Sequence, residues 1–358
     1  MRKKKIVFVS ESLKAGGAQR IVAFLAKNMN STLFDVKLVV IGFKDQTVFD
    51  IDGVAVEYLN KSRLLKALPE IFKIFKSEKP NIVFSSIGHI NVILGISSIF
   101  FKKIKFVARE ASVISTMINY SSVNSSFFTF LIRKSYKKFS KIICQSEDMS
   151  NDFIDNFKIR KEQLVVINNP ITKIINFKQR KEINDKVNFV TVGRLSEEKG
   201  HERLLKGLAK IVAFDFTYTI IGKGPLLNDI QNKVKQLGLE EKVDFIDHRS
   251  DILNELLKYD YFLQGSFVEG FPNALLESCS VSTPVIAFKA PGGTKEIVVE
   301  GVNGYLVKNQ REFEETIQDL DKLKAISKDV KIRNSVVEKF DSKRILNTYE
   351  ATFNAVLE

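Results

Sequence analysis

Residues 188–200 are NFVTVGRLSEEKG, and this stretch decides the fold class. Asn188–Val192 has the length and the apolar, β-branched composition of a buried strand. A polar turn that contains Arg194 and Lys199 follows it, and the spacing of apolar residues predicts a helix near Glu202–Ile211. A strand, a short turn and a helix in this order begin a βαβ unit, in which the next strand runs parallel to the first.

The same alternation of strand-length and helix-length segments extends outward in both directions. In the first half the predicted strands are Ile6–Ser10, Val36–Ile41, Ile82–Ser85, Lys105–Ala108, Lys141–Gln145 and Leu164–Ile167. In the second half they are Asn188–Val192, Thr217–Ile221, Val243–Ile246, Tyr261–Gln264 and Val285–Ala287. Predicted helices lie between them. The pattern predicts an α/β protein made of doubly wound, Rossmann-like domains with parallel sheets.

The length of the chain favours two such domains, because 358 residues exceed what one hydrophobic core usually organises. A polar stretch at 168–186 interrupts the alternation. We therefore expect an N-terminal domain of residues 1–170 and a C-terminal domain of residues 171–340. Residues 341–358 are predicted to form a terminal helix.

The composition excludes several classes of protein. With 44% hydrophobic and 27% charged residues, the chain is neither disordered nor fibrous. Its two cysteines, Cys144 and Cys279, cannot build a disulfide framework, and no metal-ligand spacing occurs. The basic start at 1–5 is followed by only four apolar residues, Ile6–Val9, which are too few for a signal peptide or a membrane span. We therefore expect an intracellular protein.

The net charge is unevenly distributed. Of the formal charge of +13, residues 1–170 carry the whole excess, with 27 Lys and Arg against 14 Asp and Glu, whereas the remainder has 28 of each. This asymmetry indicates that one domain faces an anionic partner: nucleic acid, an acidic membrane surface or a phosphorylated substrate. A lysine-rich background composition is the alternative, but it does not explain the balanced second half.

The segment 112–139 combines apolar side chains, such as Phe127 and Phe130, with the basic run Arg133–Lys138. An interfacial helix inserts an apolar face while its basic residues meet anionic head groups. We therefore expect this basic half to contact an anionic membrane surface. The alternative is a core helix with a solvated basic end. Nucleic-acid binding is not expected, because no recognition helix or stacking platform accompanies the charge.

Three polar or glycine-rich turns follow predicted strands of the second half, at 193–200, 222–225 and 269–277. Ligands of parallel α/β sheets bind at the carboxyl ends of the strands, so these turns should meet at one crevice. Arg194 and Lys199 suit a diphosphate, and the helix in the third turn directs unpaired N–H groups to the same place. The sequence predicts a site that stabilises a departing nucleoside diphosphate without a metal.

Two carboxylates of the third turn, Glu269 and Glu277, are eight positions apart, the second about two turns along the predicted helix. Carboxylates accept paired hydrogen bonds from vicinal diols, so one could bind the transferred sugar and the other a ribose. Either glutamate alone would be interpreted as a solvated or capping residue. Their combination with Arg194, Lys199 and Gly270–Asn273 favours a binding site.

These motifs resemble those of GT-B glycosyltransferases, and in particular the large retaining family 4, which builds lipopolysaccharide, capsule and O-antigen sugars. The resemblance covers nearly the whole chain. Its matching segments are Gly16–Arg20, Asn168–Ile171, Gly193–Gly200, Gly222–Gly224, Glu269–Glu277, Pro284–Val285 and Gly292–Ile297. It implies two Rossmann-like domains that face each other across a cleft, with acceptor bound by the first and donor by the second. The terminal helix would pack back on the first domain.

The resemblance also implies roles for individual residues. Arg194 and Lys199 would contact the donor pyrophosphate, Glu269 the donor sugar and Glu277 the ribose. The further donor-binding positions would be Gly17, Gly193, Gly222, Gly270, Phe271, Pro272, Asn273, Ala274 and Leu275, with backbone amides near 271–275 on the phosphates. Acceptor contacts are expected at Gly16, Arg20 and His89, although a lone histidine before an apolar helix is more often structural.

One departure from the family pattern affects the catalytic loop. Many members have a histidine after the strand Lys105–Ala108, where this chain has Arg109, Glu110 and Ala111. Arg109 and Glu110 are therefore the candidates for contact with the reacting centre. The alternative is that they pair with each other or cap the next helix. Two Asp-x-Asp matches, at 50–52 and 319–321, are not expected to bind a metal, because neither follows a buried strand.

Together, the residues and the resemblance predict a retaining, metal-independent glycosyltransferase without a cofactor. It would move a hexose or N-acetylhexosamine from a nucleotide diphosphate sugar, UDP-linked by preference, to a lipid-linked glycan of O-antigen, capsule or lipopolysaccharide assembly. We expect it on the cytoplasmic face of the membrane. One alternative is a sugar-nucleotide 2-epimerase, which would need further acid and base residues around the sugar ring. A catalytically silent scaffold is the other.

Overall fold

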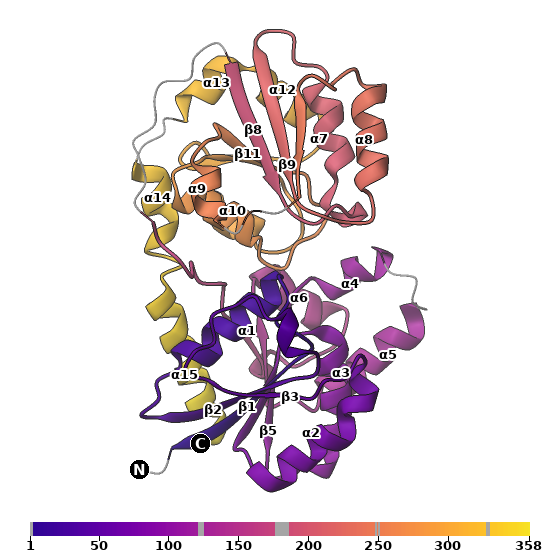
Figure 1. Ribbon diagram of the computed structural model, residues 1–358, viewed down its shortest axis with the longest axis vertical. Coiled ribbons are helices and arrows are strands. Elements are labelled where there is room, and N and C mark those ends of the chain that lie inside the picture. Colours follow the sequence, from indigo (N-terminus) through magenta and orange to yellow (C-terminus); the bar gives the residue numbers. More distant parts are fainter. Residues whose placement is uncertain (1–2, 121–124, 176–185, 248, 250, 327–329) are drawn as a thin grey trace. The chain divides into compact units, whose positions relative to one another are not determined.

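The computed structural model describes residues 3–120, 125–175, 186–247, 249, 251–326 and 330–358, and its contacts divide the chain into two units. Unit 1 comprises Met1–Pro170 together with Ser342–Glu358, and unit 2 comprises Ile171–Asp341 (Figure 1). Each unit holds one parallel sheet between helices, which confirms the predicted α/β class with two Rossmann-like domains. Parts of the predicted interfacial segment (121–124) and of the polar stretch at the predicted domain boundary (176–185) lie outside the described residues.

The sheet of unit 1 has the order β3-β2-β1-β4-β5-β6-β7. Its strands are β1 (Lys4–Ser10), β2 (Phe34–Val40), β3 (Ala55–Tyr58), β4 (Ile82–Ser85), β5 (Lys105–Arg109), β6 (Lys141–Cys144) and β7 (Leu164–Val166). Strand β1 pairs with both β2 and β4, so the order of the chain reverses between β1 and β4. The loops that follow these two strands are therefore neighbours at the carboxyl edge of the sheet.

The helices of unit 1 cover both faces of this sheet. They are α1 (Gly17–Asn28), α2 (Leu64–Glu78), α3 (Gly88–Ser97), α4 (Ile114–Met117), α5 (Ser125–Tyr136), α6 (Glu147–Asp155) and the terminal α15 (Ser342–Leu357). Helix α15, yellow in Figure 1, lies beside β1 and β2, and its residues Ile345, Tyr349 and Phe353 share one buried cluster with α1 and the sheet. The core of unit 1 thus includes the end of the chain.

Unit 2 contains the sheet β10-β9-β8-β11-β12-β13. Its strands are β8 (Lys186–Val192), β9 (Asp215–Ile221), β10 (Val243–Ile246), β11 (Tyr261–Gln264), β12 (Val285–Phe288) and β13 (Gly304–Val307). The order of the chain reverses between β8 and β11. The edge strand β13 was not predicted; it has only four residues, begins with a glycine and is half-buried at its centre.

Two hydrophobic clusters pack against opposite faces of the unit 2 sheet. One contains residues of α7 (His201–Leu208), α8 (Leu227–Gln236), α12 (Gln310–Gln318) and α13 (Leu320–Ala325). The other contains residues of α9 (Ile252–Leu256), α10 (Asn273–Ser280), α11 (Thr294–Ile297) and α14 (Val330–Val337). Since both faces of the sheet are covered, the inner strands β11 and β12 are buried along their whole length.

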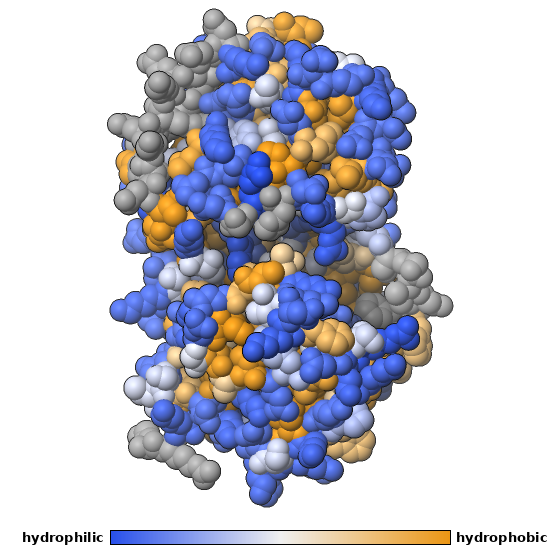
Figure 2. All heavy atoms as spheres, in the orientation of Figure 1, coloured by the Kyte–Doolittle hydropathy of each residue, from blue (hydrophilic) through white to orange (hydrophobic). Residues whose placement is uncertain are grey.

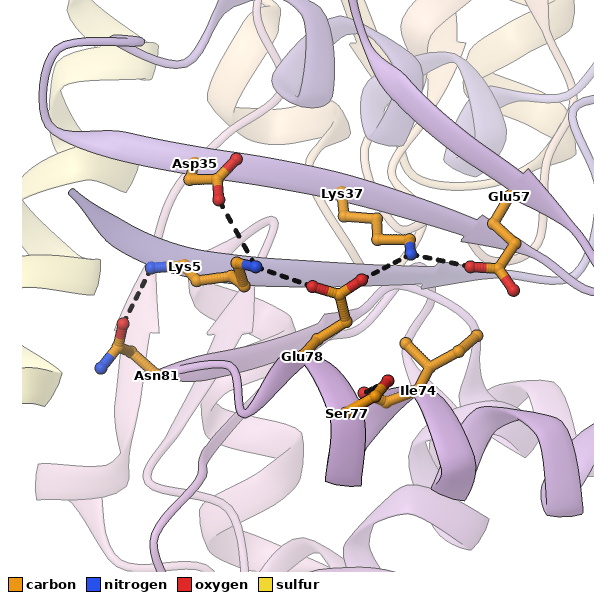
Figure 3. Close-up of polar contacts among 8 residues, drawn as sticks. All are labelled: Lys5, Asp35, Lys37, Glu57, Ile74, Ser77, Glu78 and Asn81. Atoms are coloured by element: carbon orange, nitrogen blue, oxygen red, sulfur yellow. Dashed lines mark hydrogen bonds and ion pairs between the residues drawn. The ribbon is translucent and has the colours of Figure 1, made fainter.

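A network of ion pairs joins α2 to three strands of unit 1 (Figure 3). The Glu78 carboxylate accepts hydrogen bonds from the Nζ atoms of Lys5 at 2.7 Å and Lys37 at 2.8 Å. Lys37 also pairs with Glu57 at 2.8 Å. The hydrogen bond from Lys37, followed by that from Lys5, lowers the pKa of Glu78 to about 2. The network fixes the end of α2 against β1, β2 and β3.

We expect Glu78→Gln to destabilise unit 1 at pH 7 and to have much less effect at pH 2. The folded pKa lies below the ordinary value of 4.5, so the stabilisation is complete above pH 4.5 and is lost as the pH falls toward 2. After allowance for solvent screening, the loss at pH 7 should be about 1–2 kcal/mol. Amide hydrogen exchange of β1 and β2 measures it, with the exposed Glu162→Gln as control. Equal losses at both pH values would contradict this account.

Candidate active site

Loops that follow β8, β9 and β11 lie side by side at the carboxyl edge of the unit 2 sheet. The N–H of Leu195 in the β8 loop donates to the carbonyl of Lys223 in the β9 loop at 3.0 Å. The N–H of Phe267 in the β11 loop donates to the carbonyl of Glu198 at 2.8 Å. Backbone hydrogen bonds also join the loop after β12 to the β11 loop. The three predicted turns therefore converge, because β8 and β11 are neighbours where the order of the chain reverses.

Two glycines permit the close approach of these loops. Gly222 has a φ of 155°, and a Cβ atom there would lie 1.8 Å from the carbonyl oxygen of Gly193. Gly292 has a φ of 118°, and a Cβ atom there would lie 1.8 Å from the carbonyl oxygen of Glu269. Any other residue would force the loops apart. Gly193 and Gly222, predicted to bind donor, thus also hold two of the loops together.

Lys199 and Glu269 form an ion pair at the centre of this edge, although they are 70 positions apart in the chain. Lys199 Nζ lies 2.7 Å from Glu269 Oε1, and Ser266 Oγ donates to the same oxygen at 2.5 Å. Both side chains are largely shielded, with 27% of Lys199 and 10% of Glu269 exposed. In the described part of the chain no group donates a hydrogen bond to Oε2. That oxygen is available to a ligand, while Oε1 fixes the orientation of the carboxylate.

Arg194 is held through its backbone rather than its side chain. Its carbonyl lies 3.0 Å from His201 Nε2. Since a carbonyl only accepts, Nε2 carries the proton, and burial lowers the pKa of His201, so the imidazole is neutral. The Arg194 side chain is exposed and hydrogen-bonds to no residue that the structure describes. Sequence analysis did not identify His201, which belongs to the first turn of α7.

The start of α10 lies next to the β11 loop and presents the backbone N–H groups of its first turn there. Asn273, Ala274 and Leu275 form its first turn, and their N–H groups have no acceptor within the helix. The side chains of Phe271 and Leu275 are buried in the core of unit 2, so only their backbone can meet a ligand. The use of backbone amides for the phosphates stays a prediction. Of the other predicted donor residues, Glu277 lies half-buried in α10, and Pro272 immediately precedes this helix. The carbonyl of Gly270 accepts a hydrogen bond from the N–H of Gly293 at 2.9 Å.

The predicted acceptor residues lie on the loops after β1 and β4 of unit 1. Gly16 and Gly17 are exposed at the start of α1, and the Gly16 carbonyl accepts from the N–H of Arg20 at 3.0 Å. His89 is half exposed at the start of α3, with Nε2 3.7 Å from Glu11 Oε1. The structure thus brings His89 to the glycine-containing loop. Glu11 was not predicted, and only the strand order reveals its position.

The prediction that Arg109 contacts the reacting centre is wrong. Its guanidinium is fully buried and donates to the Tyr349 hydroxyl at 3.1 Å, to Ser86 Oγ at 2.7 Å and to Asn169 Oδ1. Tyr349 belongs to α15, and Asn169 lies next to the end of the first segment of unit 1. Arg109 therefore connects β5 to Asn169 and to α15, the two parts of unit 1 that adjoin unit 2 in the sequence. Its role is structural.

Glu110 is also buried, with only 4% of its surface exposed. Its carboxylate accepts hydrogen bonds from the Tyr136 hydroxyl and from the N–H of Ala111 at 2.9 Å. Burial raises the pKa of Glu110 and raises that of Tyr136 well above its ordinary value. The geometry contradicts the prediction of a reacting-centre contact for Glu110 as well. Nor does Glu110 form an ion pair with Arg109, because each has its own buried partners within unit 1.

Over the residues that the structure describes, no group of three or more His, Cys, Asp and Glu side chains could hold a metal ion. The two Asp-x-Asp segments have other contacts. Asp50 pairs with Lys27, and Asp319 Oδ1 accepts from the N–H of Lys322 at 2.9 Å at the start of α13. No helix in the described ranges is long and apolar enough to cross a bilayer.

Two family models together match almost the whole chain. Residues 15–173 match the model of Glycosyltransferase Family 4, and residues 173–338 match that of Glycosyl transferases group 1. The chain belongs to the group 1 glycosyltransferases. The junction of the two models lies within three residues of the division between units 1 and 2, after Pro170. The converging loops of this glycosyltransferase all lie in the part matched by the group 1 model.

Relatives of this glycosyltransferase include named enzymes. The Campylobacter jejuni N-acetylgalactosamine-N,N'-diacetylbacillosaminyl-diphospho-undecaprenol 4-alpha-N-acetylgalactosaminyltransferase is 29% identical over 314 residues, covering 84% of this chain and 85% of that protein. The amylovoran biosynthesis glycosyltransferase AmsD of Erwinia amylovora is 22% identical over 316 residues, covering 86% of each. Among solved structures, HepE of Anabaena with UDP-glucose has a TM-score of 0.80 at 21% identity, covering 98% of this chain and 99% of that one. This likeness shows the shared fold.

Proposed function

We propose that this glycosyltransferase moves a hexose or N-acetylhexosamine from a UDP-sugar to a lipid-linked glycan in cell-surface polysaccharide assembly, without a metal and with retention at the anomeric carbon. The observation that carries the proposal is the shielded Lys199–Glu269 pair beside the open amino end of α10. It places a cation, a carboxylate oxygen that accepts no hydrogen bond from the described residues, and the N–H groups at the start of a helix on one loop cluster. A nucleotide sugar presents the matching anionic diphosphate and sugar hydroxyls.

The chemistry follows from where charge develops. As the bond between the anomeric carbon and the diphosphate breaks, negative charge grows on the departing phosphate oxygen, which Arg194, Lys199 and the α10 N–H groups stabilise. Glu269 Oε2 accepts hydrogen bonds from the sugar, and Glu277 from the ribose. In the retaining reaction, the acceptor hydroxyl attacks from the leaving-group side and forms the new bond to the anomeric carbon. The departing phosphate oxygen takes the proton of that hydroxyl.

The names of the relatives support a lipid-linked acceptor. The Campylobacter jejuni enzyme is named for a diphospho-undecaprenol glycan, and AmsD for amylovoran biosynthesis. Both align over more than four fifths of this chain. An enzyme with such an acceptor meets its substrate at a membrane surface, in keeping with the basic excess of residues 1–170.

Helix α5 is the membrane-facing element in this proposal. Its residues Phe127 and Phe130 are 63% and 53% exposed, whereas Ile132 and Tyr136 on its other side are buried. Arg133 and Lys134 are exposed in its last turn. Hydrophilic residues cover most of the face of the molecule shown in Figure 2, with small separate hydrophobic groups between them. Two exposed phenylalanines before a basic turn fit insertion beside anionic head groups.

We expect Phe130→Ser to weaken binding to vesicles that contain phosphatidylglycerol by about 10- to 100-fold, since insertion of one phenylalanine contributes about 1.5–3 kcal/mol. Co-sedimentation with vesicles with and without the anionic lipid measures the partition. Val212→Ser is the matched control, because Val212 is 89% exposed in unit 2. Equal binding of Phe130→Ser and the unaltered protein would contradict the assignment of α5.

Thermal unfolding with UDP, GDP, ADP and CMP, each with and without a chelator, tests the donor site. We expect UDP to stabilise the full chain by about 2–3 kcal/mol at one hundred times its Kd, with the chelator present. Stabilisation that disappears with the chelator would contradict metal independence, and no response to any diphosphate would favour a silent scaffold. Incubation with UDP-sugars and no acceptor separates the remaining alternative, because a 2-epimerase would convert the sugar itself.

A further inference from the structure

We propose that Arg203 is a positioning residue for donor-sugar recognition, which sets the place of Glu269 without touching the donor. The inference rests on the proposed function, in which Glu269 binds the sugar. No family motif described above includes Arg203, and its position in the first turn of α7 gives no indication of this role in the sequence.

Arg203 binds the backbone of the loop that carries Glu269. Its Nε donates to the carbonyl of Gly265 at 2.6 Å, and its Nη2 donates to the carbonyl of Ser266. These are the first two residues after β11. Ser266 in turn donates through Oγ to Glu269 Oε1 at 2.5 Å. A single residue, Ser266, therefore links the Arg203 guanidinium to the Glu269 carboxylate. Its carbonyl accepts from Arg203, and its hydroxyl donates to Glu269.

The guanidinium plane is itself fixed by two aromatic rings. The Arg203 Cζ atom lies 4.0 Å from the ring centroid of Phe267 and 3.7 Å from that of Phe288, at the end of β12. The carbonyl of Arg203 accepts from Gln310 Nε2 of α12 at 3.1 Å, which holds the backbone from the other side. A planar cation with donors in a rigid fork satisfies two adjacent carbonyls and two ring faces together. A lysine would keep the charge but not this geometry.

A backbone contact between Gly200 and Gly265 determines the position of the neighbouring Lys199. A Cβ atom on Gly200 would lie 1.9 Å from the carbonyl oxygen of Gly265, so the two backbones are in direct contact. Lys199 precedes Gly200, and Arg203 follows it by three positions. Lys199 is therefore placed by the backbone contact between Gly200 and Gly265, whereas the Arg203 side chain acts on Glu269 through Ser266.

This arrangement predicts a selective effect on ligand binding. In the proposed function Arg194, Lys199 and the α10 N–H groups hold the diphosphate, while Glu269 holds the sugar. A shift of the β11 loop should therefore weaken the binding of a sugar nucleotide more than that of the nucleotide alone. A general loss of structure in unit 2 would weaken both equally.

The test compares UDP, UDP-glucose and UDP-N-acetylgalactosamine on the full chain by isothermal titration calorimetry. We expect Arg203→Lys to weaken binding of the preferred UDP-sugar by about tenfold, the loss for one charge-assisted hydrogen bond, and to leave UDP within about twofold. Arg311→Lys is the matched control, because Arg311 is 87% exposed on α12. Equal losses for UDP and the UDP-sugar, or none for either, would overturn the inference.

A double substitution with Glu269→Gln decides whether Arg203 acts through Glu269. If it does, Arg203→Lys should have no further effect on UDP-sugar binding once Glu269 is replaced. Additive losses would overturn the inference while the donor site stands. Failure of the unaltered protein to bind UDP or either UDP-sugar would instead overturn the proposed UDP-sugar donor, and the role of Arg203 with it. The two failures are therefore distinguishable.

Discussion

Replacement of Lys199 by alanine is expected to reduce sugar transfer by about 10²–10³-fold and to leave unit 2 folded. The loss has two causes. The variant removes a cation from the place where the diphosphate acquires charge, and it leaves the Glu269 carboxylate, only 10% exposed, without its partner at 2.7 Å. The free carboxylate would then repel the diphosphate that Lys199 attracts.

Initial rates at saturating donor and acceptor measure this effect, with thermal unfolding as the check on folding. Lys206→Ala is the matched control, because Lys206 lies in the neighbouring helix α7, is 52% exposed and pairs with Glu202 at the surface. We expect it to have the rate of the unaltered enzyme. A Lys199→Ala enzyme within threefold of that rate would refute the assigned role in leaving-group stabilisation.

Arg109→Met is expected to destabilise unit 1 by about 3 kcal/mol or more. The side chain is fully buried, and its removal leaves Ser86, Asn169 and Tyr349 without the donor that each of them meets in the interior. It also removes a positive charge that favours the ionised form of the buried Glu110 carboxyl. The main consequence should be loosening of α15 from the sheet.

Urea unfolding, followed by amide hydrogen exchange of α15, measures the effect. Arg63→Met is the control, because Arg63 is exposed in the same unit. An Arg109→Met protein of unchanged stability but without activity would restore the catalytic role that the sequence suggested for this residue. Equal loosening of α15 in both variants would show that Arg109 does not anchor it.

The alternation of apolar and amphipathic segments was sufficient to predict the class of fold. Predicted and observed bounds coincide for Ile82–Ser85, Val243–Ile246 and Tyr261–Gln264, which are short strands flanked by polar turns. The order of strands within each sheet does not follow from such a pattern, because it depends on contacts between distant segments. Strand β13 was missed because it has only four residues, begins with a glycine and shows no alternation of buried and exposed positions.

Some features of the candidate site can be recognised in the sequence because the local backbone geometry restricts the residue type. The glycine-rich turns after β8 and β9 are evident from the sequence because backbones that approach this closely exclude a Cβ atom. Arg109 was misassigned because a charged residue at the end of a strand resembles a site residue. Its partners, which show that it is structural, are 23, 60 and 240 positions away.

Arg203 and His201 were missed for a different reason. Both donate to backbone carbonyls, at Gly265, Ser266 and Arg194, and a carbonyl exists at every position whatever the side chain. No pattern of residue types can therefore identify the acceptor. Only the three-dimensional structure shows that the first turn of α7 holds two of the loops that converge at the site.

The contribution of α15 to the core of unit 1 has a consequence for biosynthesis. A ribosome completes residues 1–170 early, but Ile345, Tyr349 and Phe353 are made only after the roughly 170 residues of unit 2. At about 5–20 residues per second, the nascent first unit waits about 10–30 s with an apolar face uncovered. Unit 2 is continuous and can complete its own core first. The half of the protein that is translated first is therefore the half that finishes folding last.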